Sequence, residues 1–141
     1  LPKSLSQLTS IEDLNLSYNR IHSGENFTVL SGLEKLQLLW LDANELKVLP
    51  RQIGELSNLK RLFLDHNYLT EFPEEMQKMR SLRVLHLGNN RVTEYPKVFY
   101  KMRTLILLHI NNNRISNLSK EYKSNRFNIK VTTHICISSK S

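Results

Sequence analysis

The sequence predicts an α/β solenoid, in which short parallel strands alternate with return segments along most of the chain. Two observations predict this fold. Asparagines recur at positions 19, 44, 67, 90 and 113, which are 25, 23, 23 and 23 residues apart. Before each asparagine, leucines or similar apolar residues alternate with other residues, as in a short β-strand. A repeat length of about 20 to 50 residues indicates an array of one structural unit.

The same frame of apolar residues surrounds each asparagine. Its third copy runs Leu59-x-x-Leu62-x-Leu64-x-x-Asn67-x-Leu69. Alternate strand residues point to opposite faces, so the paired leucines of each copy face one side. One repeat cannot bury its apolar residues alone, and neighbouring repeats must therefore stack around a continuous core. The frame predicts parallel strands at residues 14–16, 39–41, 62–64, 85–87 and 108–110.

The repeated asparagines stand where the chain turns away from each strand. An amide side chain at this point can both donate to and accept from backbone groups that the sheet leaves unpaired. We therefore expect a buried structural ladder, with no catalytic role, formed by Asn19, Asn44, Asn67, Asn90 and Asn113.

Three of the return segments contain an apolar residue followed by proline, at Leu49-Pro50, Phe72-Pro73 and Tyr95-Pro96. Together with the leucine frame, this 23-residue unit resembles the leucine-rich repeat family, and within it the intracellular Ras-binding and scaffold members. The resemblance implies a right-handed superhelix with a concave parallel β-sheet and a helical or turn-like convex side. It also implies that the concave face binds a protein partner.

The two ends depart from the regular frame. Leu1-Pro2 fits the second half of a repeat, so we expect the chain to begin inside a longer array, and two additional residues near Gly24 predict a bulged return loop. Residues 1–118 then form about five repeats. Residues 119–141 form a basic tail, either non-repeat or folded as an irregular cap that uses the strand-like alternation around Ile129.

Composition excludes several classes of protein. One cysteine, 4 glycines and 4 prolines in 141 residues exclude collagen-like and disulfide-stapled chains. No apolar run approaches the roughly 18 residues of a transmembrane helix. Six of the 20 lysines and arginines, but one of the 13 acidic residues, lie in residues 114–141, so the repeats are nearly neutral and we expect no nucleic-acid partner. Extracellular leucine-rich repeat proteins usually carry caps with several cysteines, whereas this chain has Cys136 alone, so the resemblance implies a reducing, cytoplasmic location.

The outward strand positions form columns across the predicted sheet, because neighbouring strands lie about 4.8 Å apart. Large exposed aromatic side chains dominate the binding energy of many interfaces, although they can also simply shield the sheet. We expect eleven residues to contact a partner: Trp40, Phe63, His86 and His109 in a central column, Leu38, Arg61, Val84 and Leu107 on one side, Asp42 and Asp65 on the other, and Tyr18 beyond them.

His86, His109 and Asp65 also raise the question of a metal or acid–base site. The repeat spacing supplies no further ligand, and an open solenoid face is not an enclosed pocket. The sequence shows no glycine-rich phosphate loop, catalytic triad order or Cys-x-x-Cys pair. We therefore expect no metal, cofactor or catalytic residue, but crowding of the two imidazoles predicts that partner binding depends on pH.

The leading functional prediction is a non-enzymatic scaffold or signalling adaptor that binds a protein partner. The alternative is the recognition arm of a larger enzyme, such as a ubiquitin ligase, phosphatase, cyclase or kinase, whose catalytic domain lies outside these residues. A third interpretation is binding of a polyanion or an acidic membrane through the basic tail. The sequence identifies neither the partner nor the oligomeric state.

Overall fold

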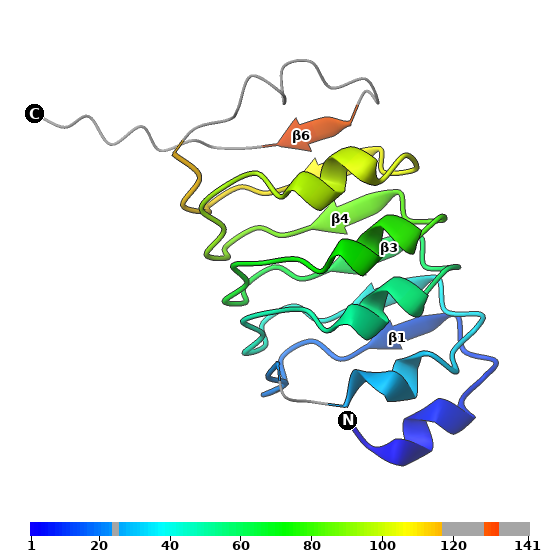
Figure 1. Ribbon diagram of the computed structural model, residues 1–141. Coiled ribbons are helices and arrows are strands. Elements are labelled where there is room, and N and C mark those ends of the chain that lie inside the picture. Colours follow the sequence, from blue (N-terminus) through cyan, green and yellow to red (C-terminus); the bar gives the residue numbers. More distant parts are fainter. Residues whose placement is uncertain (24–25, 117–128, 133–141) are drawn as a thin grey trace, which may run out of the picture.

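In the computed structural model the chain coils repeatedly, with strands on one side of each coil and helices on the other (Figure 1). The structure describes residues 1–23, 26–116 and 129–132. Within them, six strands pair in sequence order to form one parallel sheet. The strands are β1 (Asp13–Asn15), β2 (Leu38–Trp40), β3 (Arg61–Phe63), β4 (Val84–His86), β5 (Leu107–His109) and β6 (Lys130–Thr132).

The predicted parallel strands are confirmed, with each strand beginning one residue earlier than the leucine frame suggested. Leu39 lies opposite Leu62, which lies opposite Leu85 on the next strand. Backbone pairing continues past the strand ends, because the N–H of Leu41 donates to the carbonyl of Phe63 at 2.8 Å. A constant register places equivalent positions of successive repeats side by side.

The convex side consists of short 3₁₀ helices rather than α-helices. They are η1 (Lys3–Gln7), η2 (Phe27–Leu30), η3 (Arg51–Glu55), η4 (Glu74–Lys78) and η5 (Lys97–Lys101). All except η2 directly follow a proline, whose fixed φ suits entry into a helical turn. Asn26 replaces the proline before η2, where its side chain accepts a hydrogen bond from the N–H of Thr28 at 3.1 Å. The bulge expected at Gly24 lies outside the described residues.

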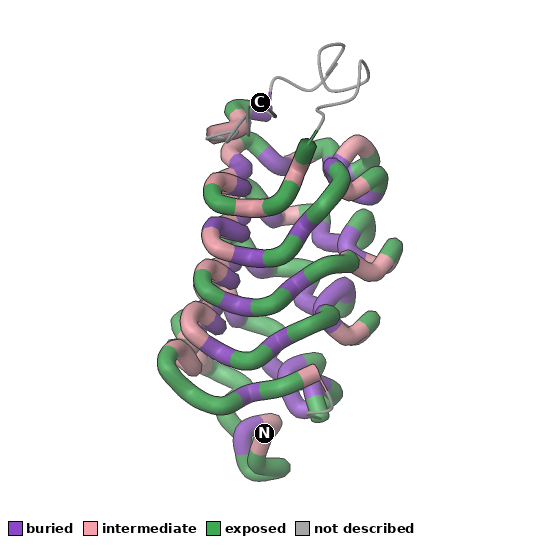
Figure 2. The backbone as a smooth tube through the Cα atoms, turned by 90° about the vertical axis from the view of Figure 1, so that its left-hand side faces the viewer, coloured by how far each residue is buried: buried purple, intermediate pink, exposed green. Residues whose placement is uncertain are grey.

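The core runs the length of the solenoid between the sheet and the 3₁₀ helices. Leu39, Leu62, Leu85 and Leu108 point inward from the strands and are fully buried. Figure 2 shows that the buried positions recur on every coil of the chain. Phe99, Met76 and Ile53 fill the helical side of the same core.

The asparagine ladder forms, but burial is incomplete at its ends. Asn44, Asn67 and Asn90 are buried, and each joins two repeats because its Oδ1 accepts from the preceding repeat's backbone. The prediction of burial is wrong for Asn19, which is exposed because no described repeat precedes it. Its Nδ2 still donates to the carbonyls of its own repeat. Asn113, at the other end, is half-buried.

The sheet continues beyond the regular repeats. In β6, Val131 lies opposite Leu108 of β5, and the preceding Ile129 is buried. This short segment forms a sixth strand of the sheet, and the choice between a cap and a non-repeat tail for residues 119–141 stays a prediction. Residues 117–128 and 133–141 lie outside the described residues, so the division at residue 118 stays a prediction. Among the described helices, none is long and apolar enough to cross a membrane.

Candidate functional site

A continuous stack of rings crosses the exposed face of the sheet. We call it the aromatic stripe, and it consists of Trp40, Phe63, His86 and His109, the last residues of β2 to β5. The ring centroids of Trp40 and Phe63 are 5.4 Å apart with planes at 4°, and those of Phe63 and His86 are 4.8 Å apart. His86 and His109 follow at 4.2 Å. The parallel register creates this stack because each ring is the strand partner of the next.

The stripe ends differently on its two sides. Beyond His109, the Thr132 hydroxyl lies 2.6 Å from His109 Nδ1. Beyond Trp40 stands Asn15, whose Oδ1 accepts from the N–H of Ser17 at 2.9 Å. Asn15 is exposed and carries no ring, so the aromatic stack stops at Trp40. The aromatic stripe therefore ends in a polar contact at His109 and in an indole face without a stacked ring at Trp40.

A second column runs along one side of the stripe, at the first residue of each strand. Leu38, Val84 and Leu107 are half-buried there, whereas Arg61 is exposed. The structure thus brings the four predicted apolar and basic residues next to the aromatic stripe. Their combined surface is partly apolar, which is the composition expected for the centre of an interface.

Two carboxylates border the other side of the stripe. Asp42 accepts a hydrogen bond from the N–H of Asp65 at 2.9 Å and another from the Ser17 hydroxyl at 3.3 Å. Asp65 accepts from the N–H of Gly88, and its Oδ2 lies 3.4 Å from His86 Nδ1. Burial raises the pKa of Asp42, and the negative charge of Asp65 raises it further, against the opposing effect of these hydrogen bonds.

The surroundings of His109, at the end of the stripe, favour its uncharged form. Burial lowers the pKa of His109, and the positive charges of His86 and Lys130 lower it further, while Asp65 opposes them. The described residues contain no group of three or more His, Cys, Asp or Glu side chains placed to hold a metal ion. The pH dependence expected from the two imidazoles stays a prediction.

Tyr18 and its equivalents mark a backbone feature that the sequence analysis did not find. The residue before each repeated asparagine has a positive φ, and this set is Tyr18, Ala43, His66, Asn89 and Asn112. Tyr18 is 87% exposed and extends the predicted surface at its β1 edge. Asparagine tolerates the left-handed region better than most residues, so its recurrence at 89 and 112 was the available signal.

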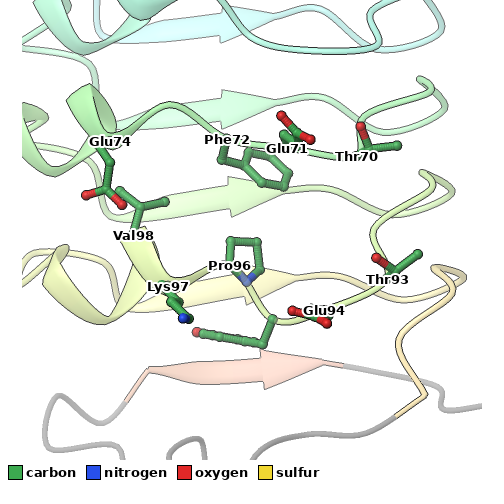
Figure 3. Close-up of a pocket in the computed structure, with 10 residues that line it drawn as sticks. Thr70, Glu71, Phe72, Glu74, Thr93, Glu94, Pro96, Lys97 and Val98 are labelled. Carbon is green, nitrogen blue, oxygen red and sulfur yellow. The ribbon is translucent and has the colours of Figure 1, made fainter.

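A groove of about 430 Å³ is a second candidate site, outside the aromatic stripe. Figure 3 shows that two successive connecting segments line it, one around Phe72 and the other around Pro96. Glu71 and Glu94, at equivalent positions of successive repeats, both line it. The signal in the sequence was the pattern Thr-Glu-aromatic-Pro, which occurs at residues 70–73 and again at 93–96.

Comparisons with known proteins agree with this architecture. A sequence model of the family described as leucine rich repeat matches residues 34–92. The structure is similar to a leucine-rich repeat protein of Leptospira interrogans, with a TM-score of 0.80 and 31% identity over 94% of this chain and 33% of that one. Internalin C2 of Listeria monocytogenes gives a TM-score of 0.76 and 26% identity, over 94% of this chain and 55% of that one.

A third similar structure is the leucine-rich repeat ectodomain of the receptor kinase GASSHO1/SCHENGEN3 of Arabidopsis thaliana, solved in complex with CASPARIAN STRIP INTEGRITY FACTOR 2. Its TM-score is 0.71 and its identity 26%, over 94% of this chain and 17% of that one. The chain spans between about a sixth and about half of the length of these three relatives. No curated protein matches the sequence significantly.

The repeat pattern, the parallel sheet and these similarities define a leucine-rich repeat solenoid. Residues 34–92 belong to the leucine-rich repeat family, and the structure continues the same repeat on both sides of them. The fold is a general module for protein–protein interaction, and it leaves the choice of partner to the side chains of its exposed faces.

Proposed function

We propose that this chain is a non-enzymatic scaffold or signalling adaptor that binds a protein partner on its concave face. The observation that carries the proposal is the aromatic stripe. Four stacked rings lie on a face that the fold leaves open, and none of the four is fully buried. Rings held by their neighbours lose little conformational entropy when a partner covers them.

The surroundings of the aromatic stripe also suit a protein partner. Leu38, Val84 and Leu107 supply apolar area beside the rings, while Asp42 and Asp65 supply polar contacts at the border. An apolar centre with a polar rim is the usual anatomy of a protein interface. Association with the factor that accompanies the Arabidopsis ectodomain is a property of that protein, and it supports the use of this fold for recognition.

A second candidate function is the recognition arm of a larger enzyme. The observation that favours it is that one protein of similar structure, the Arabidopsis ectodomain, belongs to a receptor kinase, and this chain spans 17% of that ectodomain. Ubiquitin ligase, phosphatase, cyclase and kinase parents all fit such an arm. In either case the binding step uses the same face, and the cytoplasmic location expected from the sequence remains part of the proposal.

The test is capture of a partner on the immobilised 141-residue chain, followed by measurement of its affinity for variants. We expect Trp40→Ala to weaken binding about thirtyfold, or about 2 kcal/mol, as for a central hot spot. Tyr68→Ala is the matched control, since Tyr68 is an exposed aromatic residue outside the aromatic stripe and packs against Arg91. Its affinity should equal that of the unaltered chain.

A double variant distinguishes binding at the concave face from binding at the basic tail. Trp40→Ala with Phe63→Ala should abolish specific binding. Replacement of the basic tail residues outside β6 by Gln keeps the sixth strand and should remove only salt-sensitive, non-specific binding; these residues are Lys120, Lys123, Arg126 and Lys140. If the captured partner still binds the double variant but no longer binds the tail variant, the concave-face proposal is wrong and the basic tail is the binding surface.

A further inference from the structure

The aromatic stripe ends at Trp40 on the β1 side of the sheet. We call the face of the indole ring that is turned toward β1 its outer face. Phe63 covers the opposite face of the indole in a nearly parallel stack. The remaining face is therefore turned toward β1, where the strand partner is Asn15 rather than another ring. The Asn15 side chain is held by the N–H of Ser17, which leaves the indole face without a stacking partner in the described residues. Because Asn15 is exposed and carries no ring, a planar group that packs beside it can extend the stack.

The charge beside this indole face is negative. Trp40 and Asp42 both point outward, because the residue between them, Leu41, is fully buried. Their backbones are about 7 Å apart, which is two residues of a strand. Asp42 is half-buried, and its carboxylate accepts hydrogen bonds from the Ser17 hydroxyl, from the N–H of Asp65 and from its own backbone N–H. No basic side chain of the described residues lies within ion-pair distance of it.

Asp13 adds a further negative charge on the same edge of the sheet. It is exposed at the start of β1, two residues before Asn15. Arg61 and Lys130 are the basic residues of the neighbouring column, but they stand on β3 and β6, on the far side of β2 from this edge. The local excess of negative charge around Trp40 therefore attracts a cation and repels phosphates and carboxylates.

We infer that the protein partner inserts an arginine, whose guanidinium stacks on the outer face of Trp40 and pairs with Asp42. This inference rests on the proposed function and names the chemistry of the group recognised. A guanidinium is planar, permanently charged and weakly hydrated, so it can stack on a ring and bond a carboxylate with the same group. A lysine ammonium fills the cation–π position but lacks the planar, bidentate fork. The half-buried setting of Asp42 strengthens the pair relative to a fully solvated one.

The probe is the peptide acetyl-Gly-Ala-Arg-Ala-Gly-amide, titrated into the whole chain. Trp40 is the sole tryptophan, so its fluorescence and the NMR shift of its indole N–H report on this site alone. We expect saturable binding in the millimolar range. The same peptide with citrulline, which is planar but uncharged, should bind at least about tenfold more weakly, and the lysine peptide should fall between them.

Asp42→Asn should weaken binding of the arginine peptide about tenfold. The matched control is Glu94→Gln, which removes one carboxylate from the groove outside the aromatic stripe and should leave the affinity unchanged. Equal binding of the arginine and citrulline peptides would overturn the inference, as would equal losses in the two variants. The proposed function has a separate outcome. If Trp40→Ala abolishes partner binding while Asp42→Asn leaves it intact, the concave face binds a partner and the arginine assignment is wrong.

Discussion

The side chain of Asn67 accepts a hydrogen bond from the backbone N–H of Leu46 at 3.1 Å, and the two residues belong to different repeats. The Nδ2 of Asn67 donates to the carbonyl of Leu41, also in the preceding repeat, at 2.9 Å. One buried amide thus both accepts a hydrogen bond from the preceding coil and donates one to it. Leucine packing stabilises the coils, and these amide bonds fix their separation and register.

Replacing Asn67 by Ala should lower the free energy of unfolding by about 1 to 3 kcal/mol, because it leaves buried backbone groups without partners. Asn19→Ala is the control. Asn19 is exposed and bonds only the carbonyls of Leu16 and Ser17, so its loss should cost at most about 1 kcal/mol. Urea unfolding followed by circular dichroism measures both. Equal losses of unfolding free energy in the two variants would show that the hydrogen bonds between repeats add no stability beyond those within a repeat.

Gly54→Ala should destabilise the chain by about 1 to 3 kcal/mol through overpacking. A methyl group at Gly54 would overlap the backbone carbonyl of Glu75, so η3 and η4 would have to move apart. Gly32→Ala is the control, because a methyl there lies 3.3 Å from the Ser6 carbonyl oxygen and needs only a small shift. A thermal melt in which both variants match the unaltered chain would contradict the close approach of η3 and η4.

Ala43→Asn should raise the free energy of unfolding by about 0.5 to 1 kcal/mol. Ala43 has a φ of 51°, a region where an alanine Cβ is strained and asparagine is tolerated. Asn89 and Asn112 already occupy the equivalent positions of later repeats. Ala43→Gly also relieves the strain, but it increases the entropy of the unfolded chain, so its gain should be smaller. A loss of stability on Ala43→Asn would argue against strain at this turn.

Asp42→Asn should stabilise the fold at neutral pH, and the gain should shrink as the solution is acidified. Burial raises the pKa of Asp42 in the folded chain, so the unfolded chain releases this proton first as the pH rises. The folded state then binds more protons than the unfolded state, and stability falls as the pH increases from the ordinary aspartate range to the raised pKa. Asparagine does not titrate, so the Asp42→Asn variant lacks this loss of stability at higher pH.

The measurement is the difference in unfolding free energy between Asp42→Asn and the unaltered chain at pH 3, 5 and 7. The difference should grow with pH. A constant difference across this range would mean that the carboxylate is not penalised in the fold. A stable Asp42→Asn variant also ensures that its weaker binding of the arginine peptide reflects lost recognition and not unfolding.

The sequence by itself determined the repeats, the inward leucines and the parallel direction of the strands. A 23-residue period repeats one backbone path, so leucines such as Leu39 and Leu62 must meet in the core. It also predicted which residues share the columns, since the register of β2 with β3 follows from the constant period. These features depend on local pattern and repetition, which are visible in one dimension.

Only the tertiary structure decided the features that depend on distances between neighbouring coils. It showed that Asn19 is exposed, because a buried ladder position needs a repeat on its outer side. It placed the ring of Phe63 against one face of Trp40 and left the other face toward Asn15. It also brought Gly54 against the backbone of Glu75. Ring orientation, solvent exposure and backbone approach result from packing between repeats, and the leucine spacing alone does not specify them.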